Sequence, residues 1–191
     1  MGKVIVISFV TLDGVVEDPD GSGGTPQGGW AFRYGPEATA GDKFGLGPVL
    51  DTGVMVLGRT TWQLFSRIFG PRTDPFSQKM NAIPKIVASR SLERADGWQG
   101  STVLQGGLDV EVARLTEDRD VVVPGSASVV DHLAARDLVD QYRLLVFPLV
   151  LGQGRRLFAD GTAPVDLELT GTEALGPALR LVYDRHNIKE S

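Results

Sequence analysis

The sequence predicts an α/β protein, a three-layer sandwich with a mainly parallel central sheet that ends in an antiparallel C-terminal hairpin. Apolar runs alternate with helix-like segments as far as residue 137, and such alternation is typical of parallel strands joined by crossover helices. The run Lys3–Val10 is apolar almost without interruption, as expected of a strand covered on both faces. The last two segments alternate with period two around Gly176-Pro177, which predicts a hairpin.

Length and composition indicate an ordinary globular protein. A chain of 191 residues can bury one substantial core, so we expect a single domain over 1–191. Hydrophobic residues make up 42% of the chain and charged residues 23%. The net charge of −5 argues against a broad nucleic-acid surface, because such surfaces are basic.

Metal and thiol chemistry are not expected. The chain has no cysteine, and its two histidines, His132 and His186, are far apart in sequence. The apolar stretch near the N-terminus is too short for a signal peptide and far too short to span a membrane. We interpret it as the first buried strand of a cytoplasmic protein.

The first strand should end at Asp13-Gly14. The Gly- and Pro-rich segment Glu17–Gly35 predicts a long loop, and long loops in compact domains are commonly functional. Pro36 should open a helix that runs to about Leu50, although the glycines and the proline before Leu50 weaken its end.

A strand over Gly53–Leu57 then leads into a helix that begins near Arg59 and carries Trp62, which we assign to the core. The later elements are predicted from apolar periodicity, capping residues and turns. They are helices over Pro75–Asn81, Asp109–Leu115 and Ser126–Asp137, strands over Pro84–Leu92, Ser101–Gln105, Asp120–Gly125 and Asp140–Gly152, and the hairpin Val165–Leu175 with Ala178–His186.

Three strand-to-helix junctions carry residues suited to anion binding. They are Leu57–Thr61, Ala88–Ser91 and Pro124–Ser128. Ligands of open parallel sheets bind outside the carboxyl ends of the strands, where free N–H groups favour anions. This explains why Arg59 stands at a helix N-terminus, where a carboxylate would otherwise be preferred. Two phosphate sites and a glycine loop suit NADPH.

Each junction also has a simpler interpretation. Gly58 and Thr60 can serve a turn and a cap while Arg59 is solvated. The Ser89-Arg90-Ser91 stretch can be a surface loop, and Gly125-Ser126 lacks the spacing of a dinucleotide fingerprint.

Taken together, the segments resemble the dihydrofolate reductase superfamily, and more closely the branch that includes the C-terminal reductase domain of bacterial riboflavin-biosynthesis proteins. The resemblance covers nearly the whole chain. Its residues are SFVTLDGVV (8–16), LGRTTW (57–62), PKIVASRSL (84–92), VVVPGSASVVDHL (121–133) and RLLVFPLVLGQGRRLF (143–158).

The resemblance implies a dihydrofolate reductase-like fold and NADPH-dependent hydride transfer to a small heterocycle, pteridine- or pyrimidine-like. It implies that cofactor phosphates contact the three junctions, and that a dimer contact forms through the strand from Arg143 and the C-terminal hairpin. The cofactor-binding residues would be Gly58, Arg59, Thr60, Thr61, Ser89, Arg90, Gly125, Ser126, Ala127 and Ser128. Pro124-Gly125-Ser126 departs from the two or three glycines that are common in the family.

The proton donor is the least defined part of the predicted site. The family's carboxylate on the first helix falls nearest to Asp42, and Asp13 at the end of the first strand is the other candidate. Their simpler interpretations are a solvated side chain for Asp42 and an Asp-Gly turn for Asp13.

The leading hypothesis is therefore an NADPH-dependent reductase. Leu12, Trp30 and Phe32 would contact the substrate, with the two aromatic rings stacked on a flat ring. The alternative is a nucleotide-binding or structural protein of the same fold without redox activity. True dihydrofolate reductase activity is a third possibility, and it would depend on Asp42.

Overall fold

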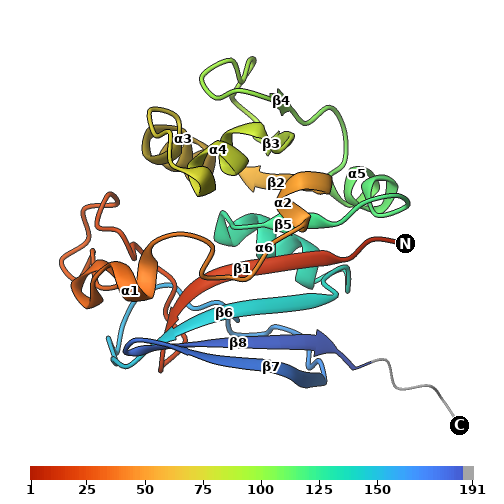
Figure 1. Ribbon diagram of the computed structural model, residues 1–191. Helices are drawn as coiled ribbons and strands as arrows, with labels where there is room; N and C mark the ends of the chain where they lie inside the picture. The colour runs from red at the N-terminus through yellow and green to blue at the C-terminus, as the bar shows by residue number, and fades with distance from the viewer. Residues whose placement is uncertain (187–191) are drawn as a thin grey trace, which may run out of the picture.

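The computed structural model describes residues 1–186, which build one eight-stranded sheet with helices on both faces (Figure 1). The strands are β1 (Val4–Thr11), β2 (Val54–Gly58), β3 (Lys85–Ala88), β4 (Ser101–Val103), β5 (Val121–Val123), β6 (Gln141–Phe147), β7 (Leu167–Leu175) and β8 (Ala178–Arg185). The helices are η1 (Phe32–Tyr34), α1 (Pro36–Thr39), α2 (Val49–Thr52), α3 (Arg59–Phe69), α4 (Pro75–Ala82), α5 (Leu108–Leu115) and α6 (Ala127–Ala134).

The strand order is β4-β3-β2-β5-β1-β6-β8-β7. All neighbours from β4 to β6 are parallel, whereas β8 pairs antiparallel with both β6 and β7. The prediction of a mainly parallel α/β sheet with an antiparallel C-terminal hairpin is confirmed. The strand β1 is central, which explains why its apolar run is almost continuous.

Alternate residues of β1 belong to two different cores. Val4, Val6 and Val10 pack in one cluster with α5 and α6. Ile5 and Ile7 pack on the opposite face in a second cluster, which also contains core residues of α2, α3 and α4. The two layers of helices therefore lie on opposite faces of the sheet, and both cores meet at β1.

The predicted helix from Pro36 to Leu50 is wrong. The structure forms α1 and α2 instead, and an irregular segment separates them. Within that segment the Asp42 carboxylate accepts hydrogen bonds from the backbone N–H groups of Leu46 (2.8 Å) and Gly47 (2.7 Å). Gly45 and Gly47 have φ angles of 63° and 49°, which a helix does not allow. Local side-chain bonding thus replaces the helical ladder.

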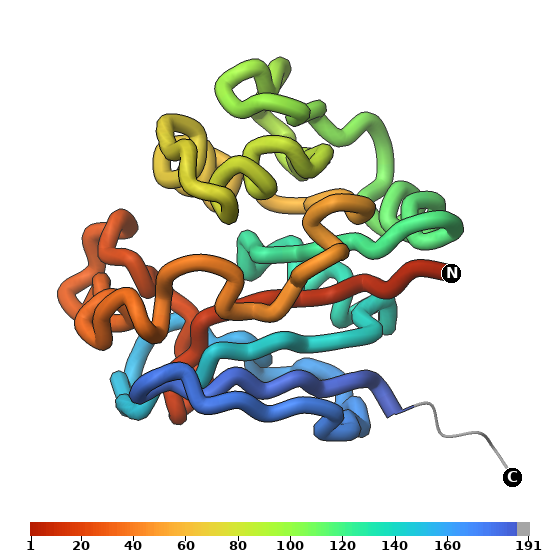
Figure 2. The backbone as a smooth tube through the Cα atoms, viewed as in Figure 1, coloured from red at the N-terminus to blue at the C-terminus, as the bar shows by residue number. Residues whose placement is uncertain are grey.

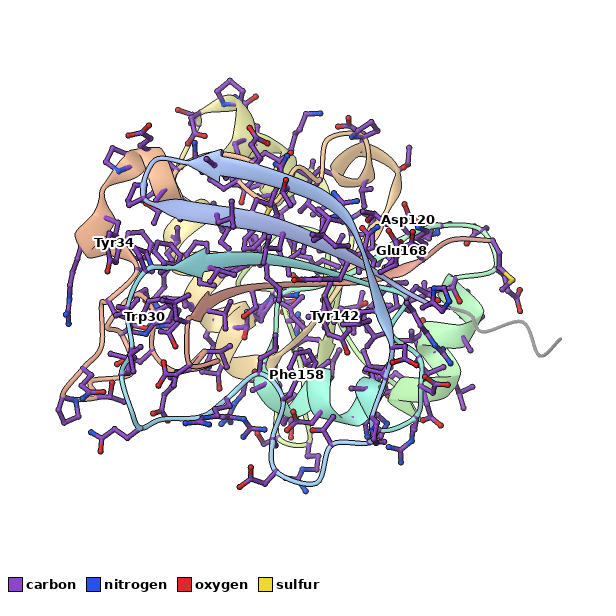
Figure 3. All side chains as sticks on the ribbon, turned by 90° about the horizontal axis from the view of Figure 1, so that it is seen from below. Trp30, Tyr34, Asp120, Tyr142, Phe158 and Glu168 are labelled. Atoms are coloured by element: carbon purple, nitrogen blue, oxygen red, sulfur yellow. The ribbon has the colours of Figure 1, made fainter. Side chains whose placement is uncertain are left out.

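The connection from β1 to β2 wraps around the carboxyl end of the sheet, at the left of Figure 2. Trp30 anchors it, because its side chain is fully buried and its indole N–H donates to the backbone oxygen of Glu17 (2.8 Å). The ring meets Phe147 of β6 edge-on, with 5.5 Å between centroids. Figure 3 shows Trp30 and Tyr34 together at this end of the sheet. They belong to a third apolar cluster, which closes this end of the sheet.

The hairpin of β7 and β8 forms one border of the sheet and leaves apolar side chains exposed. Leu169 is 50% exposed and Leu179 is 41% exposed. A register shift between Leu169 and Gly171 interrupts the pairing of β7 with β8. On the helix side of β6, Phe158 packs against Tyr142 with centroids 5.4 Å apart, and both are labelled in Figure 3. None of the helices within residues 1–186 has the length and apolar character needed to cross a membrane.

Lys85 of β3 is a charged side chain inside the molecule, with 1% of its surface exposed. Its amine donates to the carbonyl oxygens of Asn81 (2.9 Å), Ile83 (2.7 Å) and Gln99 (3.0 Å). It also lies 4.2 Å from the centre of the Trp98 ring. Burial lowers the pKa of Lys85 to about 8. The amine therefore ties three stretches of backbone together, a role that the strand pattern did not reveal.

The stability of the protein should depend on pH through Lys85. Its pKa is about 8 when folded and about 10.4 in an unfolded chain. Between these values the unfolded chain binds more protons, so this contribution to the free energy of unfolding rises with pH. Below about pH 8 both states are protonated and the contribution is constant. Urea unfolding of wild type and Lys85→Met from pH 7.5 to 10.5 measures the difference in slope.

Lys79→Met is the matched control, because Lys79 lies at the surface in an ion pair with Asp51. It should keep the wild-type slope, whereas Lys85→Met should lose it. Equal slopes for wild type and Lys85→Met would contradict the prediction.

Candidate active site

The junctions that follow β2 and β5 touch each other through their backbones. The N–H group of Gly58 donates to the backbone oxygen of Gly125 at 3.0 Å. A Cβ atom on Gly58 would lie 2.4 Å from Oγ of Ser126, and one on Gly125 would lie 2.9 Å from Oγ1 of Thr61. The hydroxyls of Thr61 and Ser126 are 3.4 Å apart. Glycine is thus required on both sides of this contact.

Both helices that start here have free N-termini. Helix α3 begins at Arg59 after Gly58, and α6 begins at Ala127 after Ser126. Neither start carries a side-chain cap among the described residues, and neither first turn contains an acidic residue. The first N–H groups of a helix have no partner within it, and the helix dipole makes them attractive to anions. Two such ends therefore meet at the Gly58–Ser126 contact.

The junction after β3 reaches the same place through Arg59. Its guanidinium donates to Oγ of Ser91 at 2.8 Å. The hydroxyl of Ser89 accepts from the N–H groups of Ser91 (3.3 Å) and Leu92 (3.0 Å), which ends β3 earlier than predicted and shapes the turn. Arg90, in the same turn, is exposed. The structure thus brings the three predicted junctions together at one edge of the sheet, at the left of Figure 1.

The connections that leave β2 and β5 go to opposite faces of the sheet. Trp62 of α3 packs in the core on one face, whereas Val129, Val130 and Leu133 of α6 pack in the core on the other. The strands β2 and β5 are direct neighbours. Two adjacent parallel strands whose helices diverge create the switch point at which α/β sheets bind ligands. We call the residues Gly58–Thr61, Ser89–Ser91 and Gly125–Ser128 the junction rim.

Asp13 follows β1, and its carboxylate accepts hydrogen bonds from three groups. It accepts from the Thr11 hydroxyl (2.6 Å) and from the backbone N–H groups of Gly152 (2.7 Å) and Leu151 (3.2 Å). The bonds from Thr11 and Gly152 lower the pKa of Asp13 to about 2. Asp13 is therefore ionised at neutral pH. It ties the end of β1 to the turn that follows β6.

Asp42 does not lie on a helix, contrary to the prediction. Its two carboxylate oxygens accept the N–H groups of Leu46 and Gly47. The backbone of the same segment is held from the other side by Arg143, whose guanidinium donates to the carbonyl oxygens of Phe44 and Gly45. Asp42 thus organises a loop, and its proposed role as a proton donor stays a prediction.

The three predicted substrate contacts differ in their environments. Leu12 is 65% exposed and Phe32 is 50% exposed, so both are accessible. Trp30 is 0% exposed, and the expectation that its ring stacks on a substrate is wrong. The indole N–H donates to the backbone oxygen of Glu17 and the ring packs against Phe147, so Trp30 lies inside the protein.

Sequence reasoning missed two phenylalanines close to Phe32. The rings of Phe9 and Phe44 are stacked, with centroids 5.5 Å apart and planes at 20°. Phe32 meets Phe9 edge-on at 6.4 Å. Strict alternation along β1 would have placed Phe9 on the same face as Ile5 and Ile7. Phe44 had no such signal, because it belongs to the segment that was predicted as a helix.

Two surface hollows lie apart from the junction rim. One, of about 290 Å³, lies between Val15, Glu17, Gln27 and the turn at Leu151–Gly154. The other, of about 430 Å³, lies between α2 and α4 beside Asp51 and Lys79. Neither is lined by residues of the junction rim.

The sequence matches one known protein family over most of its length. Residues 2–181 match the family described as the RibD C-terminal domain. The chain belongs to this family. The resemblance that the sequence motifs indicated is therefore confirmed, and it extends over nearly the whole chain.

Individual relatives are distant but cover the full chain. The uncharacterized protein YwjB of Bacillus subtilis (strain 168) is 27% identical over 190 residues, which is 96% of this chain and 98% of YwjB. The crystal structure of a protein of Shewanella sp. PV-4, whose name assigns it to riboflavin biosynthesis, has a TM-score of 0.74 at 20% identity. That match covers 98% of this chain and 100% of the other.

A pyrimidine reductase-like protein of Corynebacterium diphtheriae has a TM-score of 0.64 at 12% identity, covering 97% of this chain and 92% of its own. At such identities the solved structures establish the shared fold.

The pH dependence of stability should reveal the Asp13 contacts. The folded pKa of Asp13 is about 2, below the value of about 3.9 in an unfolded chain. Its stabilisation is therefore complete above about pH 4 and is lost as the pH falls toward 2. Wild type should be more stable than Asp13→Asn at pH 6, and the difference should shrink between pH 4 and 2 in thermal unfolding.

Asp160→Asn serves as the control, because Asp160 is an exposed carboxylate. It should remain close to wild type at every pH. A constant difference between wild type and Asp13→Asn down to pH 2 would disprove the assignment.

Proposed function

We propose that this protein is an NADPH-dependent reductase that transfers a hydride to a small heterocyclic substrate of the pteridine or pyrimidine type. The contact between Gly58 and the Gly125–Ser126 junction carries the proposal. It puts two uncapped helix N-termini and the guanidinium of Arg59 at one edge of the sheet. Membership of the RibD C-terminal domain family and the reductase-like names of solved relatives support it.

The residues of the junction rim fit a phosphorylated dinucleotide. A pyrophosphate needs backbone N–H donors and a close approach, which the starts of α3 and α6 and the glycines at 58 and 125 supply. Hydroxyls of Thr60, Thr61 and Ser128 add donors, and Arg59 with Arg90 suits a separate phosphate. NADPH would supply the hydride. The rim would hold and orient it.

The two candidate donors of the proton that accompanies the hydride are Asp13 and Asp42. Asp13 is ionised at neutral pH, so it is suited to holding the turn after β6 and not to donating a proton. Asp42, whose oxygens accept the N–H groups of Leu46 and Gly47, stays the candidate donor. True dihydrofolate reductase activity would require it to donate, and predicts that Asp42→Asn abolishes turnover while cofactor binding survives.

The alternative is a nucleotide-binding or structural protein of the same fold without redox activity. One observation favours a structural role: the Ser126 hydroxyl fills space against Gly58, at the position where a smaller residue would leave more room for a ligand. The reductase and a nucleotide-binding protein both require the junction rim to bind a dinucleotide. They differ only in whether bound NADPH is oxidised.

Two further expectations stay predictions. One is a homodimer built on β6 and the C-terminal hairpin, which the exposed Leu169 and Leu179 support. The other is a cytoplasmic location.

Arg59→Ala should weaken NADPH binding about tenfold or more, because a charge-assisted hydrogen bond to phosphate is lost. Fluorescence titration measures it through the three tryptophans. Arg67→Ala is the matched control, since Arg67 lies in the last turn of the same helix and is exposed. It should bind NADPH as wild type does. Equal affinities for wild type and Arg59→Ala would remove the rim from the cofactor site.

Catalysis is tested by NADPH oxidation at 340 nm with a panel of oxidised pteridines and pyrimidines. A reductase should oxidise NADPH with at least one of them, and Arg59→Ala should lower kcat/KM for that substrate. Tight NADPH binding with no oxidation by any member of the panel would favour the binding-only alternative.

A further inference from the structure

We propose that Phe9, Phe32 and Phe44 form the platform on which the flat ring of the substrate stacks, and that Asp42 and Arg143 hold Phe44 in place. This inference rests on the proposed function, because it names the substrate part of the same site. We call the three phenylalanines the aromatic platform.

The aromatic platform lies at the same end of the sheet as the junction rim, because β1 is longer than β5. The last residue of β5, Val123, lies opposite Val6, whereas β1 continues to Thr11. Phe9 therefore lies three residues beyond the end of this pairing, where the chain of β5 has already turned into Gly125 and Ser126. A ring stacked at Phe9 therefore lies at the same end of the sheet as the junction rim. The proposal requires substrate and cofactor to meet there, because hydride transfer needs reacting atoms about 3–3.5 Å apart.

The three rings have the geometry of a stacking surface. Phe9 and Phe44 are nearly parallel, at 20°, and Phe32 meets Phe9 at 69°. Phe32 is 50% exposed, and the other two are partly buried. Phe147 supports Phe9 from inside, edge-on at 5.4 Å. A partly exposed stack of rings that rests on buried Phe147 gives a flat heteroaromatic molecule apolar contact area and fixes its orientation.

The backbone that carries Phe44 is held by three charged side chains. Asp42 accepts the N–H groups of Leu46 and Gly47, on the C-terminal side of Phe44. Arg143 donates to the carbonyl oxygens of Phe44 and Gly45, and Arg180 donates to that of Lys43 at 3.3 Å.

Arg143 is itself fixed, because its Nε donates to Gln141 at 2.6 Å. Burial lowers the pKa of Arg143, while the charge of Asp42 acts in the opposite direction. Holding the nine-residue irregular segment 40–48 in one conformation costs conformational entropy, and these contacts offset that cost and fix the position of Phe44.

This arrangement assigns Asp42 a positioning role. Both Asp42 oxygens accept backbone N–H groups, at 2.7–2.8 Å, so the carboxylate binds the loop that carries Phe44. The carboxylate acts on the substrate through Phe44. A positioning residue and a proton donor at Asp42 predict different effects of the same substitutions at this residue.

Lumazine, a flat bicyclic pteridine, is the probe. Isothermal titration calorimetry of lumazine into wild type, with and without NADP⁺, should show binding. Phe44→Leu keeps an apolar side chain but loses the stacked ring, so lumazine should bind about tenfold more weakly. NADPH affinity should not change. Phe158→Leu is the matched control, because Phe158 is a 40% exposed phenylalanine that packs on Tyr142. It should bind lumazine like wild type.

The positioning role is tested with two substitutions of Asp42. Asp42→Ala removes both acceptors and should weaken lumazine binding as much as Phe44→Leu does. Asp42→Asn keeps one amide oxygen that can accept an N–H group, so it should recover part of the affinity. A proton donor predicts the opposite: lumazine affinity unchanged in both variants, with turnover lost in both.

Failure of this inference can be told apart from failure of the proposed function. Wild type that binds NADPH, with Arg59→Ala weakened, but binds no lumazine would overturn the aromatic platform alone. Unchanged lumazine affinity in Phe44→Leu would do the same. Wild type that binds lumazine through Phe44 but shows no NADPH binding would instead overturn the reductase proposal and keep the ring site.

Discussion

The backbone contact between Gly58 and Gly125–Ser126 is the constraint on which the candidate site depends. It exists because β2 and β5 are neighbours in the sheet while the helices that follow them go to opposite faces. A side chain at Gly58 would collide with Ser126, so the two helix N-termini can approach only if this residue is glycine. In the proposed function Arg59 contacts a phosphate of the cofactor, which would explain its place at the positive end of a helix dipole.

Much of the fold followed from the sequence because its signals were local and repeated. The continuous apolar character of β1, the strand-to-helix junctions and the period-two hairpin were read from a few residues each, and the family motifs placed them in one fold. The site was predicted less well. Asp42 was predicted to lie on a helix, but its carboxylate binds backbone N–H groups of an irregular loop. Trp30 was predicted to contact the substrate, but its indole N–H binds a buried backbone oxygen. Phe9 and Phe44 meet only through tertiary packing, which no spacing in the sequence encodes.

Four charged side chains in this protein bind backbone groups of irregular segments. Asp13 binds the turn after β6, Asp42 and Arg143 bind opposite sides of one loop, and Lys85 binds three carbonyl groups. Each replaces hydrogen bonds that regular secondary structure would have supplied. Irregular segments can then be held at fixed positions around both ends of the sheet. Such fixed loops allow a shared scaffold to carry different sites, because only the loops need to change.

The irregularity in β7 has a consequence for the behaviour of the protein in concentrated solution. An open sheet border is a template for strands of other molecules, and proteins commonly block it with bulges and charges. Here the shift at Leu169–Gly171 bends the outermost strand, and Glu168 and Glu173 put acidic side chains on it. At the opposite border β4 has only three residues. Neither border offers a long, flat, uncharged ladder, so the sheet resists growth into fibrous aggregates at the strand level.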